Sequence, residues 1–184
     1  MTIAAPLRTS APPASAAVRA AAAAPASARR GWLLLAVVSA VGALDQASKA
    51  WAWRELPLVH INSGGGLLFG DRAGTVYRDG RLGTAIDLAG VALVALVAAV
   101  LLRFRWPRLP FLGAALVLGG WASNLADRLG LHNVTAPGSA RGVVDFLRWG
   151  GRLWNVADVV MIAGVLLGAA GAVQLLRTRA APSG

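Results

Sequence analysis

Four aspartates in this 184-residue chain lie in or beside long apolar runs, which is a costly position for a carboxylate. They are Asp45, Asp127, Asp145 and Asp158. Two carboxylates that are held close together cannot both ionise easily, so one keeps its proton while the other acts as a base. Such a pair can activate a water molecule and polarise a peptide carbonyl without a metal or a covalent nucleophile. The four residues therefore indicate peptide hydrolysis as one candidate chemistry.

The polar residues around these aspartates also have spacings that ordinary helices use. Asp45 and Lys49 are four positions apart with the acid first, so they can pair on one helix face. Asn155 is a good helix N-cap, and Asp158 would then lie at the third helical position, near the positive end of the helix dipole. A third set shares one helical stripe, namely Asn124, Asp127 and Arg128. Any single pair could be structural, but the convergence of the whole set is hard to explain by structure alone.

Two of the aspartates have simpler interpretations. Asp127 is a rival member of a catalytic pair, but its neighbour Arg128 offers a charge partner, although adjacent helical side chains diverge. We interpret Asp127 and Arg128 as structural support for the site. Asp145 could be a solvated loop acid that pairs weakly with the arginines of its own segment. These are Arg141, Arg148 and Arg152.

Other catalytic schemes fit the sequence less well. The chain has no cysteine, which excludes disulfides, thiolate metal sites and a cysteine nucleophile. It has two histidines but no HExxH motif, and no G-x-S-x-G elbow. A serine–lysine dyad would need Lys49, the only lysine, for which Asp45 is the more plausible partner. We therefore expect no metal and no cofactor.

The composition points to a membrane protein. The chain is 57% hydrophobic and only 14% charged, which is too apolar for a soluble domain of this size. We expect an all-α fold, a bundle of four transmembrane helices. The predicted spans are 31–53, 84–102, 110–130 and about 155–176. The formal net charge of +10 does not indicate nucleic-acid binding, because the arginines cluster beside apolar runs and no nucleic-acid motif is present.

The arginines predict how the spans are oriented. Residues 1–30, the 103–109 connection and residues 177–184 carry arginines but no acid. We therefore expect both termini to be cytoplasmic, with 1–30 as a disordered tail, 31–176 as the membrane domain and 177–184 as a second tail. Segments 54–83 and 131–154 then face outward. A cleaved secretory signal at the first span, and a transit peptide within residues 1–30, remain alternatives.

Two further functions remain open at this point. A small proton-coupled transporter could use intramembrane Asp and Lys as a proton relay, which predicts polar residues along the full depth of the bundle. A structural membrane subunit would tolerate Asp145→Asn and Asp158→Asn. In the predicted topology the polar residues stop in the outer half, which favours an endopeptidase that acts at the membrane–water boundary.

Five motifs resemble those of lipoprotein signal peptidase, also called signal peptidase II, in their order and topology. They are DQASK (45–49), NSGGGLLFG (62–70), GGWASNLADR (119–128), VVDF (143–146) and WNVAD (154–158). The resemblance covers about 31–176. It implies that Asp145 and Asp158 form a catalytic aspartic dyad. It gives shaping or substrate-holding roles to Asp45, Lys49, Asn62, Gly64, Asn124, Asp127, Arg128 and Asn155.

The same resemblance implies the substrate, the location and part of the fold. Members of the family are membrane proteins of bacterial cells that cleave the signal peptide from diacylglyceryl-modified prolipoproteins, just before the lipid-bearing cysteine. They need no metal, and globomycin inhibits them. The resemblance also implies a small β platform and a short, mobile outer helix from 54–83. This sequence departs from the family pattern at Ser123, where glycine is usual and where we expect a crowded helix contact, and at Trp154, where phenylalanine is usual.

Overall fold

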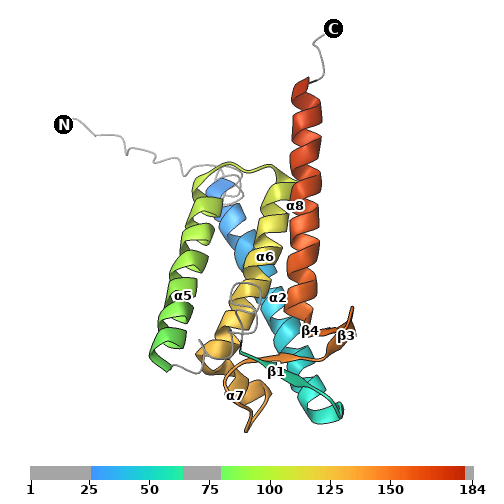
Figure 1. The fold of residues 1–184 in the computed structure, drawn as a ribbon. Coiled ribbons are helices and arrows are strands. Elements are labelled where there is room, and N and C mark those ends of the chain that lie inside the picture. The colour runs from blue at the N-terminus through green and yellow to red at the C-terminus, as the bar shows by residue number, and fades with distance from the viewer. Residues whose placement is uncertain (1–25, 64–79, 181–184) are drawn as a thin grey trace, which may run out of the picture.

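The computed structural model describes residues 26–63 and 80–180 (Figure 1). In this part of the chain, four helices are long and apolar enough to cross a membrane, which confirms the predicted fold class. The long helices are α2 (Ala26–Glu55), α5 (Gly80–Arg103), α6 (Arg108–Ala126) and α8 (Val156–Ala180). Predicted tail residues 1–25 and 181–184, Gly64 and most of the predicted outer helix lie outside the described residues.

The four helices form a bundle whose two ends differ (Figure 1). Helix α2 begins and α8 ends at one end of the bundle, and four short strands lie at the other, which we call the strand end. At the opposite end, Leu34 of α2, Leu101 of α5 and Phe111 of α6 pack into one buried apolar cluster with Ala115 and Leu118. This end of the bundle is therefore apolar, and the buried polar side chains of the site described below lie at the strand end.

Small residues let α6 and α8 approach closely. A Cβ atom on Gly120 would lie 2.6 Å from the carbonyl oxygen of Ala157, and one on Gly113 would lie 2.5 Å from that of Gly164. On α8, Ala157 and Gly164 are seven residues apart, so they lie on the same face. Close backbone approach at small residues is a common means of packing membrane helices. It fixes the first turn of α8 against α6.

Helix α6 does not end as a regular helix. The segment η2 (Asp127–Leu131) follows it and is kinked at Gly130, whose φ of 121° is not helical and favours glycine. A short helix, α7 (His132–Thr135), continues the chain, and its first residue, His132, is buried.

Two small antiparallel sheets form the predicted β platform. Strand β1 (His60–Asn62) pairs with β2 (Val143–Asp145), with His60 opposite Asp145. Strands β3 (Leu147–Trp149) and β4 (Arg152–Trp154) form a hairpin. Its two turn glycines have φ of 58° and 75°, values that suit the tight turns of such hairpins. The sheets carry Asp145 to the first turn of α8.

We predict that Gly120→Ala destabilises the protein and lowers its activity. The added methyl group would meet the Ala157 carbonyl at 2.6 Å, so the first turn of α8 must shift. Overpacking of this kind costs about 1–3 kcal/mol. Thermal unfolding in detergent measures the effect. Gly168→Ala on α8 is the matched control, because a Cβ there meets nothing within 4 Å. Equal melting temperatures for the two variants would contradict the prediction.

Candidate active site

Lys49 is the centre of a buried polar network at the strand end. Its Nζ atom lies 2.5 Å from Asp45 Oδ2, 2.6 Å from Asp127 Oδ2 and 2.8 Å from Asn124 Oδ1. The side chains of Lys49, Asp45 and Asp127 are fully buried. An ammonium group has three N–H donors, and these three acceptors match them. The expected Asp45–Lys49 pair is confirmed, and Lys49 also joins α2 to the end of α6.

Asp45 extends this network to α8. Its Oδ1 atom accepts a hydrogen bond of 2.9 Å from the backbone N–H of Ala157, and its Oδ2 atom accepts one of 2.7 Å from the Ser123 hydroxyl. The N–H groups in the first turn of a helix have no partner inside the helix. Asp45 supplies one such partner from another helix, and so it fixes the position of the start of α8.

Asn155 and Asp158 cap α8 reciprocally. The Asn155 side-chain oxygen accepts the backbone N–H of Asp158 at 2.9 Å, and the Asp158 carboxylate accepts the backbone N–H of Asn155 at 3.2 Å. This is the geometry of a capping box, as the spacing predicted. Asn124 of α6 donates a further hydrogen bond of 2.9 Å to Asp158 Oδ1. The Asp158 carboxylate is therefore held from two helices.

Asp145 is held by two asparagine side chains. Asn155 Nδ2 donates to its Oδ1 atom at 2.7 Å, and Asn62 Nδ2 donates to its Oδ2 atom at 3.0 Å. Asn155 thus contacts both Asp145 and Asp158, which brings the two carboxylates to one place. Asp145 is 1% exposed. Burial raises the pKa of Asp145 to about 6, the two asparagine hydrogen bonds oppose this rise, and the charge of Asp158 adds to it.

Two arginine pairings that the sequence left open are not found. Arg128 does not pair with its neighbour Asp127; its Nε atom lies 3.1 Å from Asp87 Oδ1 on α5. The Nη2 atom of Arg141 lies 2.5 Å from Asp87 Oδ2, so this arginine pairs with Asp87 and not with Asp145. The first result follows from the divergence of adjacent helical side chains, since Asp127 binds Lys49 of α2 while Arg128 binds Asp87 of α5.

The geometry is thus a pair of carboxylates joined by one asparagine, beside a buried lysine and at one end of an apolar bundle. Comparison with known proteins supplies the context. Residues 37–173 match the family described as Signal peptidase (SPase) II. The chain belongs to this family. It is 31% identical over 154 residues to a lipoprotein signal peptidase of Xylella fastidiosa strain 9a5c, and the match covers 73% of this chain and 83% of the relative. The lipoprotein signal peptidase of strain M12 shows the same identity and coverage.

Signal peptidase II is an aspartic peptidase, so the expected enzyme class and the expected family are both confirmed. The structure describes nine of the ten sequence-predicted site residues and joins eight of them in one hydrogen-bonded network. These are Asp45, Lys49, Asn62, Asn124, Asp127, Asp145, Asn155 and Asp158. Arg128 is the exception, because it points to Asp87.

The departure at Ser123 has a polar role in this signal peptidase II. Its hydroxyl donates to Asp45 Oδ2 at 2.7 Å and accepts a hydrogen bond of 3.0 Å from Gln46 Nε2. We expected the extra side chain to crowd a helix contact, but the hydroxyl is instead part of the Lys49 network. Trp154 lies at the end of β4, and its ring nitrogen donates to the Trp149 carbonyl within the hairpin.

Sequence reasoning missed Asp87, a buried acid that binds two arginines. A signal for it was present. Asp87 is the only acidic residue in the predicted span 84–102, and a charge inside a membrane span is usually paired or functional. Its two partners lie far away in the sequence, so the spacing rules of a single helix could not identify them.

We predict that the cleavage activity of this signal peptidase II depends on an ionisation near pH 6. The pKa of Asp145 is raised to about 6, so this carboxyl loses its proton near that pH. If Asp145 must carry the proton of the pair, kcat/KM falls as the pH rises through this value. The Asn62 hydrogen bond lowers the pKa of Asp145, so Asn62→Ala should move the fall to higher pH.

The measurement is kcat/KM for a prolipoprotein substrate between pH 4.5 and 9, for wild type and Asn62→Ala. Asn62→Asp is unsuitable because it adds another charge beside Asp145. A profile in which Asn62→Ala moves the fall to lower pH, or leaves it in place, would contradict this account of Asp145.

Proposed function

We propose that this protein removes the signal peptide from diacylglyceryl-modified prolipoproteins, cleaving before the lipid-bearing cysteine, with Asp145 and Asp158 as its catalytic pair. The observation that carries the proposal is the position of Asn155. Its side-chain amide donates to Asp145 while its side-chain oxygen and backbone N–H bind the residue at the start of α8, Asp158. No other pair of carboxylates in the described residues is joined in this way without a lysine or an arginine between them.

The reaction that such a pair supports is general acid–base hydrolysis. One ionised carboxylate removes a proton from a water molecule, and the water oxygen attacks the carbonyl carbon of the scissile peptide bond. The second, protonated carboxyl donates its proton to the carbonyl oxygen, which gives a tetrahedral diol. The carboxyl that took the water proton then transfers it to the amide nitrogen, while the other carboxylate removes a proton from one diol hydroxyl. The carbon–nitrogen bond breaks to give a carboxylic acid and an amine, and the carboxyl pair again holds one proton.

The remaining polar residues hold the pair in shape. Lys49 is the cation that pairs with Asp45 and Asp127, and Asn124 connects Lys49 to Asp158. Asp45 sets the position of α8 through Ala157. By resemblance to the family, we assign site-shaping roles to these residues and to Arg128, a substrate-holding role to Asn62, and a shaping or substrate-holding role to Gly64. Gly64 lies outside the described residues.

A lipidated substrate and a membrane location suit the apolar surface of the bundle. Long side chains of α8 are exposed along its length, with Val165 60% and Leu166 65% exposed, as expected for a helix that faces lipid. We propose that the protein spans a bacterial cell membrane with both termini in the cytoplasm, because the segments at the end opposite the strands, 1–30, 103–109 and 177–184, carry arginines but no acid. The site then lies on the extracytoplasmic side, where diacylglyceryl chains can stay in the bilayer. We expect globomycin to inhibit it.

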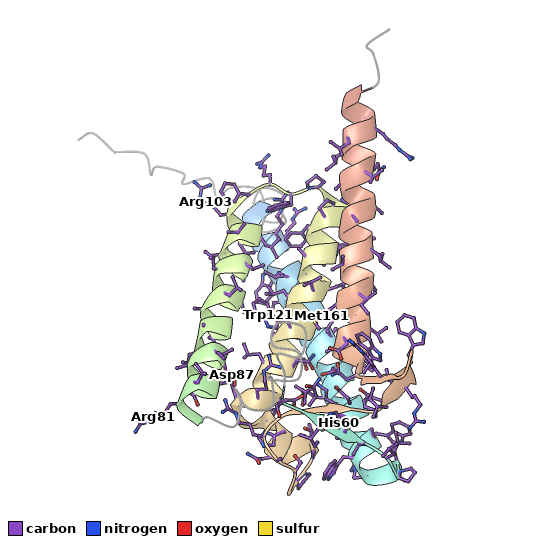
Figure 2. The ribbon with its side chains drawn as sticks, in the orientation of Figure 1. His60, Arg81, Asp87, Arg103, Trp121 and Met161 are labelled. Carbon is purple, nitrogen blue, oxygen red and sulfur yellow. The ribbon has the colours of Figure 1, made fainter. Side chains whose placement is uncertain are left out.

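The distribution of buried charge favours this proposal over a proton-coupled transporter. In the described residues, the buried acids and Lys49 lie toward the strand end, whereas the opposite half of the bundle is filled by the apolar cluster around Leu34 and Phe111. Figure 2 shows Asp87 on the part of α5 near the strands and Arg103 at the other end of that helix. A relay across the membrane would need polar groups through that apolar half.

We predict that Asp145→Asn and Asp158→Asn each lower prolipoprotein cleavage about a thousandfold or more, since each removes a general acid or base. The substrate is a purified diacylglyceryl-modified prolipoprotein, and cleavage is followed by gel shift. Asp127→Asn is the matched comparison: the new amide oxygen can still accept from Lys49, so we expect a much smaller loss.

Each variant must first elute from size exclusion in detergent as wild type does. Cleavage at the wild-type rate by Asp145→Asn or Asp158→Asn would refute the assignment of the pair. A wild-type protein that is folded but does not cleave the lipidated substrate would refute the proposed substrate class.

A further inference from the structure

A buried carboxylate on α5 lies outside the Lys49 network. Asp87 is 1% exposed, although most of α5 around it faces outward, with Leu88 58% exposed. Removing a charge from water is expensive and is tolerated only where partners compensate closely. Asp87 therefore needs an explanation beyond membrane packing.

Asp87 joins two arginines from different segments. Arg128 Nε lies 3.1 Å from one carboxylate oxygen, and Arg141 Nη2 lies 2.5 Å from the other. Arg141 Nε also donates a 2.7 Å hydrogen bond to the backbone carbonyl of Arg128. One acid thus holds two guanidinium groups side by side, and the second arginine is bound to the backbone of the first.

Both arginines are close in the chain to residues of the site. Arg128 directly follows Asp127, whose carboxylate binds Lys49. Arg141 lies two residues before β2 (Val143–Asp145), the strand that carries Asp145. Between Arg141 and β2, Gly142 packs so tightly against β1 that a Cβ would lie 2.8 Å from the Asn62 carbonyl oxygen. A displacement of Arg141 would therefore be transmitted directly to β1 and β2.

Asp87 is also a polar attachment of α5 near the strand end. At the other end, Leu101 packs into the apolar cluster with Leu34 and Phe111. Apart from Gly83, Asp87 and Leu101 are the residues of α5 that are buried in the described part of the chain. Loss of the Asp87 carboxylate would leave two positive charges in contact and would release this end of the helix from α6.

We propose that Asp87 is a positioning residue for prolipoprotein cleavage: it fixes Arg128 and, through Arg141, the approach of the strand that carries Asp145. The proposal rests on the peptidase function and on the role of Asp145 given above. Asp87 touches neither the scissile bond nor the two proposed catalytic carboxylates. It acts by cancelling the repulsion between two guanidinium groups, and this makes a prediction that simple packing does not make.

The experiment is a double-mutant cycle with Asp87→Asn, Arg141→Gln and the double variant, measuring kcat and KM on the diacylglyceryl-modified prolipoprotein together with thermal unfolding in detergent. Asp87→Asn preserves the size of the side chain but leaves Arg128 and Arg141 uncompensated. We expect kcat/KM to fall about tenfold or more, since small displacements near a reacting group are costly. Adding Arg141→Gln removes one of the two repelling charges, so the double variant should recover to within about threefold of Arg141→Gln alone.

Leu88→Ala is the control for a substitution beside Asp87 that leaves both ion pairs intact, and because Leu88 is exposed it should leave kcat/KM within about twofold of wild type. Wild-type kinetics for folded Asp87→Asn would overturn the proposal. So would losses in Asp87→Asn and Arg141→Gln that simply multiply in the double variant, because Asp87 would then act independently of Arg141.

If Asp87→Asn does not fold, the double variant is the test. Recovery of both folding and activity in the double variant supports the charge coupling, and failure to recover either one overturns it. Inactive wild type would instead reject the peptidase function.

Discussion

One buried lysine sets the geometry on which the rest of the site depends. Lys49 has no exposed surface and meets two carboxylates and one amide oxygen from α2 and α6. An uncompensated charge at this depth would be strongly destabilising, so all three partners must stay in place for the fold to persist. Two of these partners then reach α8: Asp45 through the backbone of Ala157, and Asn124 through the carboxylate of Asp158. The need to neutralise one ammonium group therefore positions the start of a helix that Lys49 itself does not touch.

The apolar part of the bundle makes this arrangement possible. Glycines bring the backbones of α6 and α8 together at Gly120 and Ala157, so that Asn124, one turn further along α6, can reach Asp158. Asp145 arrives separately, from a strand that pairs with β1, and it is fixed by amide groups and not by cations. Asp158 is likewise held by the Asn124 side chain and the Asn155 backbone N–H, and no ion pair involves either carboxylate in the described residues. Burial without an ion pair favours the protonated form of a carboxyl, which suits a pair that must keep one proton.

The sequence predicted those features that arise from local spacing or from hydropathy. The four spans follow from long apolar runs, the Asp45–Lys49 pair from a separation of four residues, and the cap at Asn155 and Asp158 from a separation of three. Contacts between distant segments could not be found in this way. Lys49 and Asp127 are 78 residues apart, and Asp87 and Arg141 are 54 apart. The partner of Arg128 is also Asp87 of another helix, so the spacing of Arg128 from Asp127 could not identify it. The polar role of Ser123 depends on Asp45 and Gln46 of another helix, so its sequence context indicated only extra bulk.

The most direct test of this account is the cleavage rate of the Lys49→Met protein on a diacylglyceryl-modified prolipoprotein. Methionine has nearly the length of lysine without its charge, and the residue it replaces contacts neither Asp145 nor Asp158 by any hydrogen bond in the described structure. We expect a protein that is less stable in detergent by several kcal/mol, about 3–5, and that cleaves at least about a hundredfold more slowly, because the start of α8 loses its anchors. A folded Lys49→Met protein that cleaves at the wild-type rate would show that the catalytic pair is held without the lysine, and the account would be wrong.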